Sequence, residues 1–141
     1  MNNWRFALTT RGSTALACTH PEAPRASEPL QTRVLLSWPL MAAEWARRLS
    51  QEAGFWGMYD IRLEASGYQG MQLLDIDGDT MPKPCVDPNI VLKREWPAQE
   101  LRENPQPLAC EMFHHLWWSF GQDEAWTDQR VITQFDLLSR R

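Results

Sequence analysis

The sequence lacks the motifs by which several common enzyme classes are recognised. It contains no glycine-rich phosphate-binding loop, no Gly-x-Ser-x-Gly nucleophile elbow and no His-Glu-x-x-His zinc motif. Nucleotide hydrolysis on a P-loop, α/β-hydrolase chemistry and zinc-dependent proteolysis therefore have no support in the residues. We predict no cofactor, and we favour a protein that binds over one that catalyses, while enzyme activity stays open.

Cysteine is scarce, and long hydrophobic runs are missing. Cys18, Cys85 and Cys110 lie far apart and form no Cys-x-x-Cys pair, which is typical of a reducing compartment. No stretch approaches the roughly 18 apolar residues of a membrane span, and the first residues lack the apolar run of a secretory signal. These features predict a cytoplasmic protein with no membrane partner.

Lysine is rare as well, with 2 Lys against 12 Arg, and the formal net charge is −4. An acidic balance does not favour a general nucleic-acid surface. Tryptophan is what the chain has in excess, with 8 residues among 141. A domain of this size is not expected to bury all eight completely, because Trp is large and its indole N–H needs a partner. Some of them are therefore expected to line a cleft or an interface.

The length is typical of one domain, and 43% hydrophobic residues is ordinary for a globular fold. We predict a single domain over residues 1–141, with Pro-rich surface loops at about 19–29 and 77–88. Near the N-terminus, apolar and polar residues alternate over 4–9. This pattern predicts a strand that pairs back with 14–18 as a hairpin.

An amphipathic helix over about 39–53 is the strongest local prediction. Its apolar residues recur at helical spacing, and Gly54 supplies the left-handed residue that ends it. The period then changes to two, which predicts a strand over 59–65, a turn over 66–70 and a returning strand over 71–76. We expect the helix to pack across the apolar face of this hairpin.

Two segments are ambiguous. Residues 30–37 fit either a strand or an extension of the helix with a kink at Pro39. We prefer the strand, because a proline disfavours α geometry in the residue before it. Residues 123–141 fit either a helix, which we prefer, or a segment that ends in a strand over 131–137.

A strand over 89–96 and a helix over 109–120 complete the prediction. The fold class is α+β: a small antiparallel or mixed sheet, with the helix over about 39–53 packed on it and a C-terminal helical segment. A terminal strand would instead give a ferredoxin-like β-α-β-β-α-β arrangement preceded by an N-terminal hairpin.

The helix over 109–120 carries the best candidate site. Its core stripe faces one way, and the Glu and two His of Glu-Met-Phe-His-His face the other, beside a tryptophan that is off the stripe. This composition is typical of an interface or of the wall of an aromatic pocket. The candidates for such a surface are Glu111, His114, His115, Trp117, Trp118 and Trp56.

Metal binding and nucleophilic catalysis are weaker hypotheses for the same helix. Glu111 and His114 form one Glu-x-x-His unit, but a third ligand would have to come from His20 or an aspartate, so we predict no metal. Three aspartates within 75–79 fail as an EF-hand loop, because the required Gly and Glu are missing. Cys110 has His114 four residues later, although a small buried apolar role is commoner for cysteine.

A basic patch is a third kind of site to consider. Arg47, Arg48 and Arg62 would meet near Trp56 if the outer face of the helix adjoined the wet face of the strand. Such a patch could hold an anion or a single nucleic-acid strand. Ion pairs with the neighbouring glutamates of the helix are the simpler interpretation.

Two hypotheses of function fit these features. The first is a non-catalytic binding protein that uses a Trp-rich surface to form a homodimer or to hold a partner protein. The second is a small-molecule site or small enzyme, in which an aromatic pocket receives a small apolar ligand beside His, Glu and Asp groups. Nucleic-acid binding ranks third and is not expected.

Overall fold

The fold is α+β, as predicted. The computed structural model describes residues 2–10, 13–22, 30–74, 80–122 and 126–140. Its larger sheet has four antiparallel strands in the order β2-β1-β4-β7. These strands are β1 (Asn2–Thr10), β2 (Ser13–Glu22), β4 (Met58–Ser66) and β7 (Asn89–Pro97).

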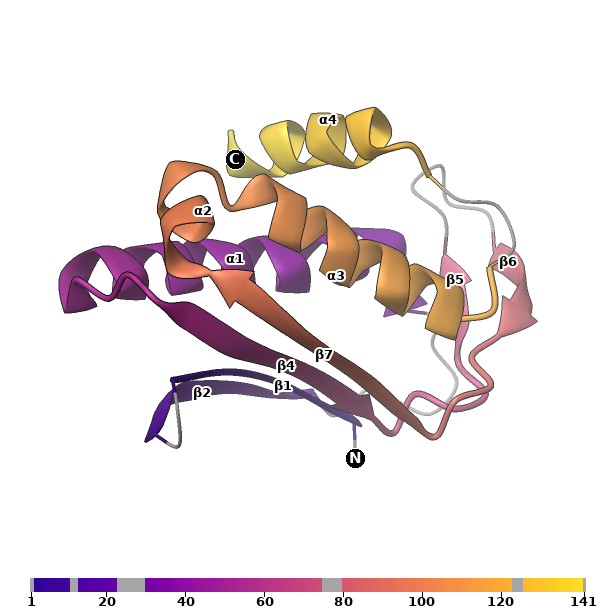
Figure 1. Ribbon diagram of the computed structural model, residues 1–141. Helices are drawn as coiled ribbons and strands as arrows, with labels where there is room; N and C mark the ends of the chain where they lie inside the picture. The colour runs from indigo at the N-terminus through magenta and orange to yellow at the C-terminus, as the bar shows by residue number, and fades with distance from the viewer. Residues whose placement is uncertain (1, 11–12, 23–29, 75–79, 123–125, 141) are drawn as a thin grey trace.

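One face of this sheet is apolar and the other is charged. Trp4, Phe6 and Leu8 of β1 are fully buried, whereas Arg5 between them is exposed. The same alternation runs through β4 and β7, which is the pattern of an antiparallel sheet with a single covered face. Figure 1 shows that all four helices lie on the same side of the sheet. None of the helices in the described ranges lies on the opposite side.

The four helices form the second layer. α1 packs against α2, α3 and α4, and α3 also contacts β7. Helix α1 ends at Gly54, whose φ of 64° is the left-handed conformation that glycine adopts at little cost. The helices are α1 (Thr32–Ala53), α2 (Ala98–Glu103), α3 (Gln106–Ser119) and α4 (Asp128–Ser139).

The prediction of a strand over 30–37 was wrong. Only Leu30–Gln31 is a strand, β3, and α1 begins at Thr32 and runs through Pro39. A proline inside a helix costs about 3 kcal/mol in exposed positions. Here the continuous helix buries Trp38, whose ring stacks on Trp4 with centroids 5.5 Å apart. Burial of large side chains, each of which stabilises by about 1.5–3 kcal/mol, outweighs the local cost.

The predicted hairpin between 59–65 and 71–76 was also wrong. β4 pairs with β7 along its whole length and with β1 over residues 60–66, whereas β5 (Gln72–Leu74) belongs to a separate sheet of order β3-β5-β6. A nine-residue strand pairs more backbone groups with two long neighbours than with a three-residue one. Residues 75–76 lie outside the described part of the chain.

Several other elements match their predictions. The N-terminal hairpin, the strand over 89–96 and the C-terminal helix are confirmed. The alternative terminal strand, and with it the ferredoxin-like arrangement, is wrong. Parts of the predicted loops are strands instead, because β2 continues to Glu22 and β6 occupies Thr80–Pro84. Residues 23–29 and 77–79 of these loops lie outside the described part of the chain.

The tryptophans divide as expected. Two are largely exposed, at 71% for Trp56 and 56% for Trp118. Trp45 and Trp96 are partly buried, and Trp45 meets the Phe6 ring edge-on at 5.7 Å. The buried members are Trp4, Trp38, Trp117 and Trp126. The chain thus does not bury all eight, and Trp56 and Trp118 stay largely exposed.

Replacing Phe6 with Ala tests the packing of α1 on the sheet. The side chain is fully buried against Trp45, so we expect the free energy of unfolding to fall by about 3–5 kcal/mol in urea titrations. Arg5→Ala, on the charged face of the same strand, is the matched control and should change it by less than about 0.5 kcal/mol. Equal effects would contradict the assignment of the two faces.

Candidate functional site

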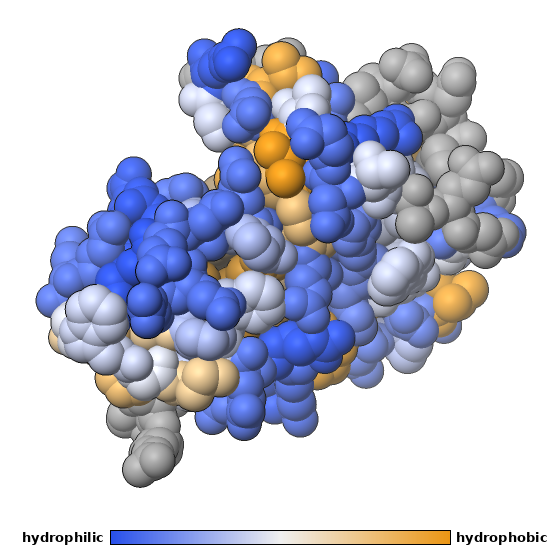
Figure 2. Space-filling view, turned by 45° about the horizontal axis from the view of Figure 1, so that its top comes forward, coloured by the Kyte–Doolittle hydropathy of each residue, from blue (hydrophilic) through white to orange (hydrophobic). Residues whose placement is uncertain are grey.

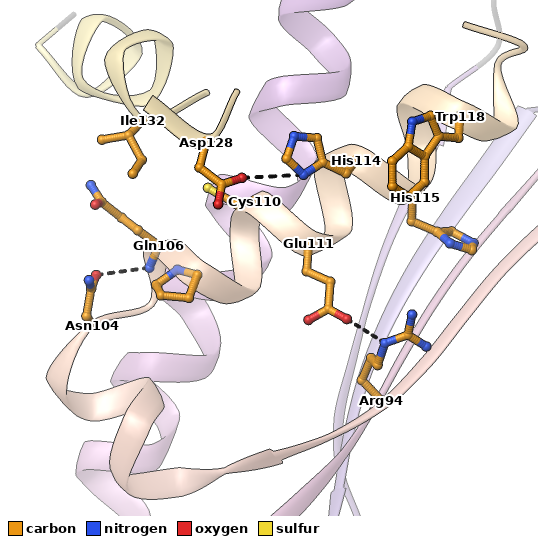
Figure 3. Close-up of a pocket in the computed structure, with 11 residues that line it drawn as sticks. Arg94, Asn104, Gln106, Cys110, Glu111, His114, His115, Trp118, Asp128 and Ile132 are labelled. Atoms are coloured by element: carbon orange, nitrogen blue, oxygen red, sulfur yellow. Dashed lines mark hydrogen bonds and ion pairs between the residues drawn. The ribbon is translucent and has the colours of Figure 1, made fainter. Parts of the chain in front are cut away.

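A groove runs along the outward face of α3, between α4 and the edge of the sheet. Its volume is about 420 Å³, and it draws residues from β7, from the turn before α3, from α3 itself and from α4 (Figure 3). The lining residues are Arg94, Asn104, Gln106, Pro107, Cys110, Glu111, His114, His115, Trp118, Asp128 and Ile132. Four of the six residues proposed from the sequence are among them.

The amphipathic character of α3 creates this groove. The predicted core stripe is confirmed, since Ala109, Met112, Phe113, Leu116 and Phe120 are all fully buried. The opposite stripe, spaced by three or four residues from Pro107 to Trp118, therefore faces outward. Because α3 lies between α4 and β7 and its outward stripe is not covered by either, a groove remains along that stripe.

His114 joins α3 to the start of α4. Its Nε2–H donates to the backbone carbonyl of Trp126 over 2.9 Å, because a carbonyl can only accept. Its Nδ1 lies 3.6 Å from a carboxylate oxygen of Asp128. Thr127 caps α4 by accepting a hydrogen bond from the backbone N–H of Arg130 over 3.2 Å. The hydrogen bond from His114 to Trp126 and the cap at Thr127 thus hold the start of α4 beside α3.

On the other side, α3 is tied to the edge of the sheet. Arg94 Nε donates to Glu111 over 2.5 Å, and the same guanidinium donates to the carbonyl of Lys93 over 2.8 Å. His115 hydrogen-bonds the backbone carbonyl of Val91. Alternate residues of a strand direct their backbone groups to opposite sides, so both carbonyls belong to the outer edge of β7. These side chains occupy an edge that would otherwise be open to pairing.

The environment of His115 favours its neutral form. Burial lowers the pKa of His115, opposed by its hydrogen bond to Val91 and assisted by the charge of Arg94. The two histidines of the predicted pair therefore have structural contacts of different kinds. His114 reaches α4, and His115 reaches β7.

Trp118 forms the aromatic wall at one end of the groove. Its ring is 56% exposed and stacks on the His114 ring, with centroids 6.0 Å apart and planes inclined by 20°. Because His114 is held by Trp126 and Asp128, the indole is supported on one face and open on the other. A supported aromatic face offers contact area at low conformational cost.

Cys110 does not have the character of a nucleophile. Burial, with a further contribution from the carboxylate of Asp128, raises the pKa of the Cys110 thiol to about 11. The residue therefore carries a protonated thiol near neutral pH, whereas the thiolate is the reactive form. The proposed Cys–His pair loses its support.

The metal hypothesis gains no support from the arrangement. Among the described residues, no group of three His, Cys, Asp or Glu side chains is placed to hold a metal ion. Glu111 is paired with Arg94, and His114 faces α4 instead. The side chain of His20 and the aspartates within 75–79 lie outside what the structure describes.

The other sequence candidates do not join the groove. Trp117 is 2% exposed and packs between Phe113 and Trp126 in the core. Trp56 lies under the guanidinium of Arg102, 3.7 Å from the ring centroid, and is not a lining residue.

The basic patch is not assembled either. Arg47 is on α1 and pairs with Glu44, at 2.9 Å. Arg62 is on the charged face of the sheet, which is the side away from the helices, and pairs with Glu64.

Sequence reasoning missed two charged members of the groove. Arg94 falls in the inward row of β7 after Ile90 and Leu92, so a charged residue interrupts an apolar row. A charged residue at an apolar position of the strand pattern could have indicated a polar site in the sequence. Asp128 directly follows the capping residue Thr127, but only the tertiary fold brings it to His114.

Comparisons with protein-family models, with curated proteins and with solved structures found no match to this chain. None of the described helices combines the length and the apolar character needed to cross a membrane. The geometry of the groove is therefore the basis for a function.

Replacing His115 with Gln tests the contact to Val91 through pH. The lowered pKa means that the unfolded chain takes up a proton on this residue before the folded one does. Glutamine at this position cannot take up a proton. The difference in free energy of unfolding between wild type and His115→Gln, in favour of wild type, should therefore be complete above about pH 6.5 and should shrink as the pH falls below that value. Urea titrations across this range measure the difference, and a constant or growing advantage would contradict the assignment.

Proposed function

We propose that this chain is a non-catalytic binding protein whose α3 groove holds an extended segment of a partner protein. The observation that carries the proposal is the length of the groove. Its lining residues run from Gln106 to Trp118, a span of about 18 Å along the helix at 1.5 Å per residue. An extended peptide covers that span with about five or six residues.

The lining suits a segment with an apolar or aromatic side chain and little net charge. Trp118 supplies a supported aromatic face, and Ile132 an apolar contact on α4. The charges of Arg94 and Glu111 compensate each other. Near the other end, Asn104 Oδ1 accepts a hydrogen bond from the backbone N–H of Gln106 over 3.1 Å, which leaves the side-chain amide of Gln106 and the NH2 group of Asn104 for backbone hydrogen bonds to a segment.

The surface around the groove favours a local anchor over a broad apolar contact. Figure 2 shows a face that is mostly hydrophilic, with hydrophobic residues in small separate areas. Binding energy at such a surface concentrates in a few aromatic side chains. The wide spacing of the three cysteines in the sequence supports the cytoplasm as the place of action.

Selection of peptides from a random display library on the wild-type protein tests this function. The Trp118→Ala variant should bind the selected peptides at least about tenfold more weakly, because an aromatic anchor contributes more than about 1.4 kcal/mol. Fluorescence anisotropy with labelled peptides measures the affinities. Trp56→Ala is the matched control, since it removes an exposed indole outside the groove, and should bind as wild type does.

Two results would contradict the proposal. One is a failure to select any peptide, and the other is a set of peptides whose affinity is the same for wild type and Trp118→Ala. Thermal unfolding of both variants serves as the control for folding.

A small apolar ligand is the second candidate. The groove volume of about 420 Å³ lies within the usual range for small-molecule sites, roughly 300–1,000 Å³. A rise in melting temperature with a small aromatic compound, absent from the Trp118→Ala variant, would favour this candidate.

A further inference from the structure

The face of the sheet opposite the helices has an unusual order of charges. Cross-strand register places Arg62 of β4 directly opposite Lys93 of β7. We call such a pair of opposite residues on this face a rung. The next rung along the strands is Asp60 opposite Glu95. Like charges directly opposite each other destabilise a sheet. This face therefore has a positive rung beside a negative rung, at the middle of the paired length of β4 and β7.

These charges are mostly uncompensated within the chain. Arg62 pairs with Glu64, whereas Asp60, Lys93 and Glu95 form no ion pair among the described residues. Between the long side chains, small residues of β1 floor a hollow of about 520 Å³.

Two further rungs flank the charged ones on the same face. The rung beyond the negative one is Met58 opposite Pro97, and the rung beyond the positive one is Glu64 opposite Val91. Met58 and Val91 are two of the large apolar side chains that the structure leaves exposed, at 49% and 39%. The two inner rungs are therefore opposite in charge about a point midway between them, whereas the outer rungs differ, with Met58 at one end and Glu64 at the other.

We propose that this face binds the same face of a second copy of the chain. The two copies are related by a two-fold axis that runs parallel to the rungs, midway between the positive rung and the negative rung. This rotation places Arg62 of each copy against Asp60 of the other copy, and Lys93 against Glu95. The same operation places Val91 against Pro97, and Glu64, which pairs with Arg62 in its own chain, against Met58. A patch with no net charge attracts neither cations nor anions in general, but it fits a surface with the signs reversed, which the second copy supplies.

The dimer is expected to be weak and sensitive to salt. Three strands at ~4.8 Å spacing and nine residues at ~3.3 Å give a footprint of roughly 400 Å² on each copy. The total of about 800 Å² is below the ~1,200 Å² of stable interfaces, so the dimer should form at high concentration and dissociate on dilution. Exposed ion pairs weaken as the ionic strength rises.

Charge-swap variants test the proposal by sedimentation velocity at low ionic strength. An acidic variant, Arg62→Glu with Lys93→Glu, and a basic variant, Asp60→Lys with Glu95→Lys, should each be monomeric where wild type dimerises. Mixed in equal amounts, the two variants should form a heterodimer at least ten times tighter than either self-association. Salt at about 1 M should weaken the wild-type dimer.

Two control variants show whether dimerisation depends on this face of the sheet. The double variant Arg48→Glu with Arg140→Glu lowers the net charge by the same amount as the acidic variant does. Its two positions are exposed, one on α1 and one just after α4, and it should dimerise as wild type does. Trp118→Ala, which removes the groove's aromatic wall, should dimerise normally too. Thermal unfolding shows that each variant is folded.

Four results would overturn the proposal. They are a wild-type chain that stays monomeric at every concentration, charge-swap variants that dimerise as wild type does, a mixture that does not associate, and loss of the dimer in Trp118→Ala. The last would assign self-association to the α3 groove. Peptide binding by the groove is measured separately, so failure of either surface leaves the other testable.

Discussion

Burial of one face of the four-stranded sheet is the interaction on which the rest of the structure depends. The apolar rows of β1, β4 and β7 all face the same way, so every helix packs on that side. Phe6 meets Trp45 edge-on, and Trp4 stacks on Trp38, which fixes α1 across the sheet. Two consequences bear on the proposals made above. The outward stripe of α3 becomes the floor of a groove, and the far face of the sheet is charged and carries none of the described helices.

The polar residues of the groove have two tasks in this arrangement. His114 and His115, adjacent in the sequence, connect α3 to α4 and to the edge of β7 respectively. Glu111 completes the second connection through Arg94. A histidine pair that resembles a chemical site in the sequence therefore fixes the walls of a channel. Trp118, which stacks on one of these histidines, stays largely exposed and is the side chain that we propose as the anchor for a ligand.

The local periodicity of the sequence predicted where helices and strands lie better than it predicted which of them pair or pack together. The stripe of α3 and the alternation of β7 could be read directly, because each depends on nearby residues alone. The strand preferred over 30–37 failed since a local rule about Pro39 was outweighed by burial of Trp38 in the folded core. The expected hairpin failed because β4 pairs with β1, more than fifty residues earlier, and no local pattern encodes that choice. The contact between Asp128 and His114 is likewise set by the tertiary fold and not by a local sequence pattern.

The most direct test of the groove is the indole N–H region of the NMR spectrum during titration with a selected peptide. Each of the 8 tryptophans contributes its own signal, so the spectrum reports where on the molecule the peptide sits. We predict a large shift for Trp118, with the signals of Trp56 and of the core tryptophan Trp38 unchanged. A shift of Trp56 with Trp118 unchanged would contradict binding in the groove and would place the binding surface beside α2.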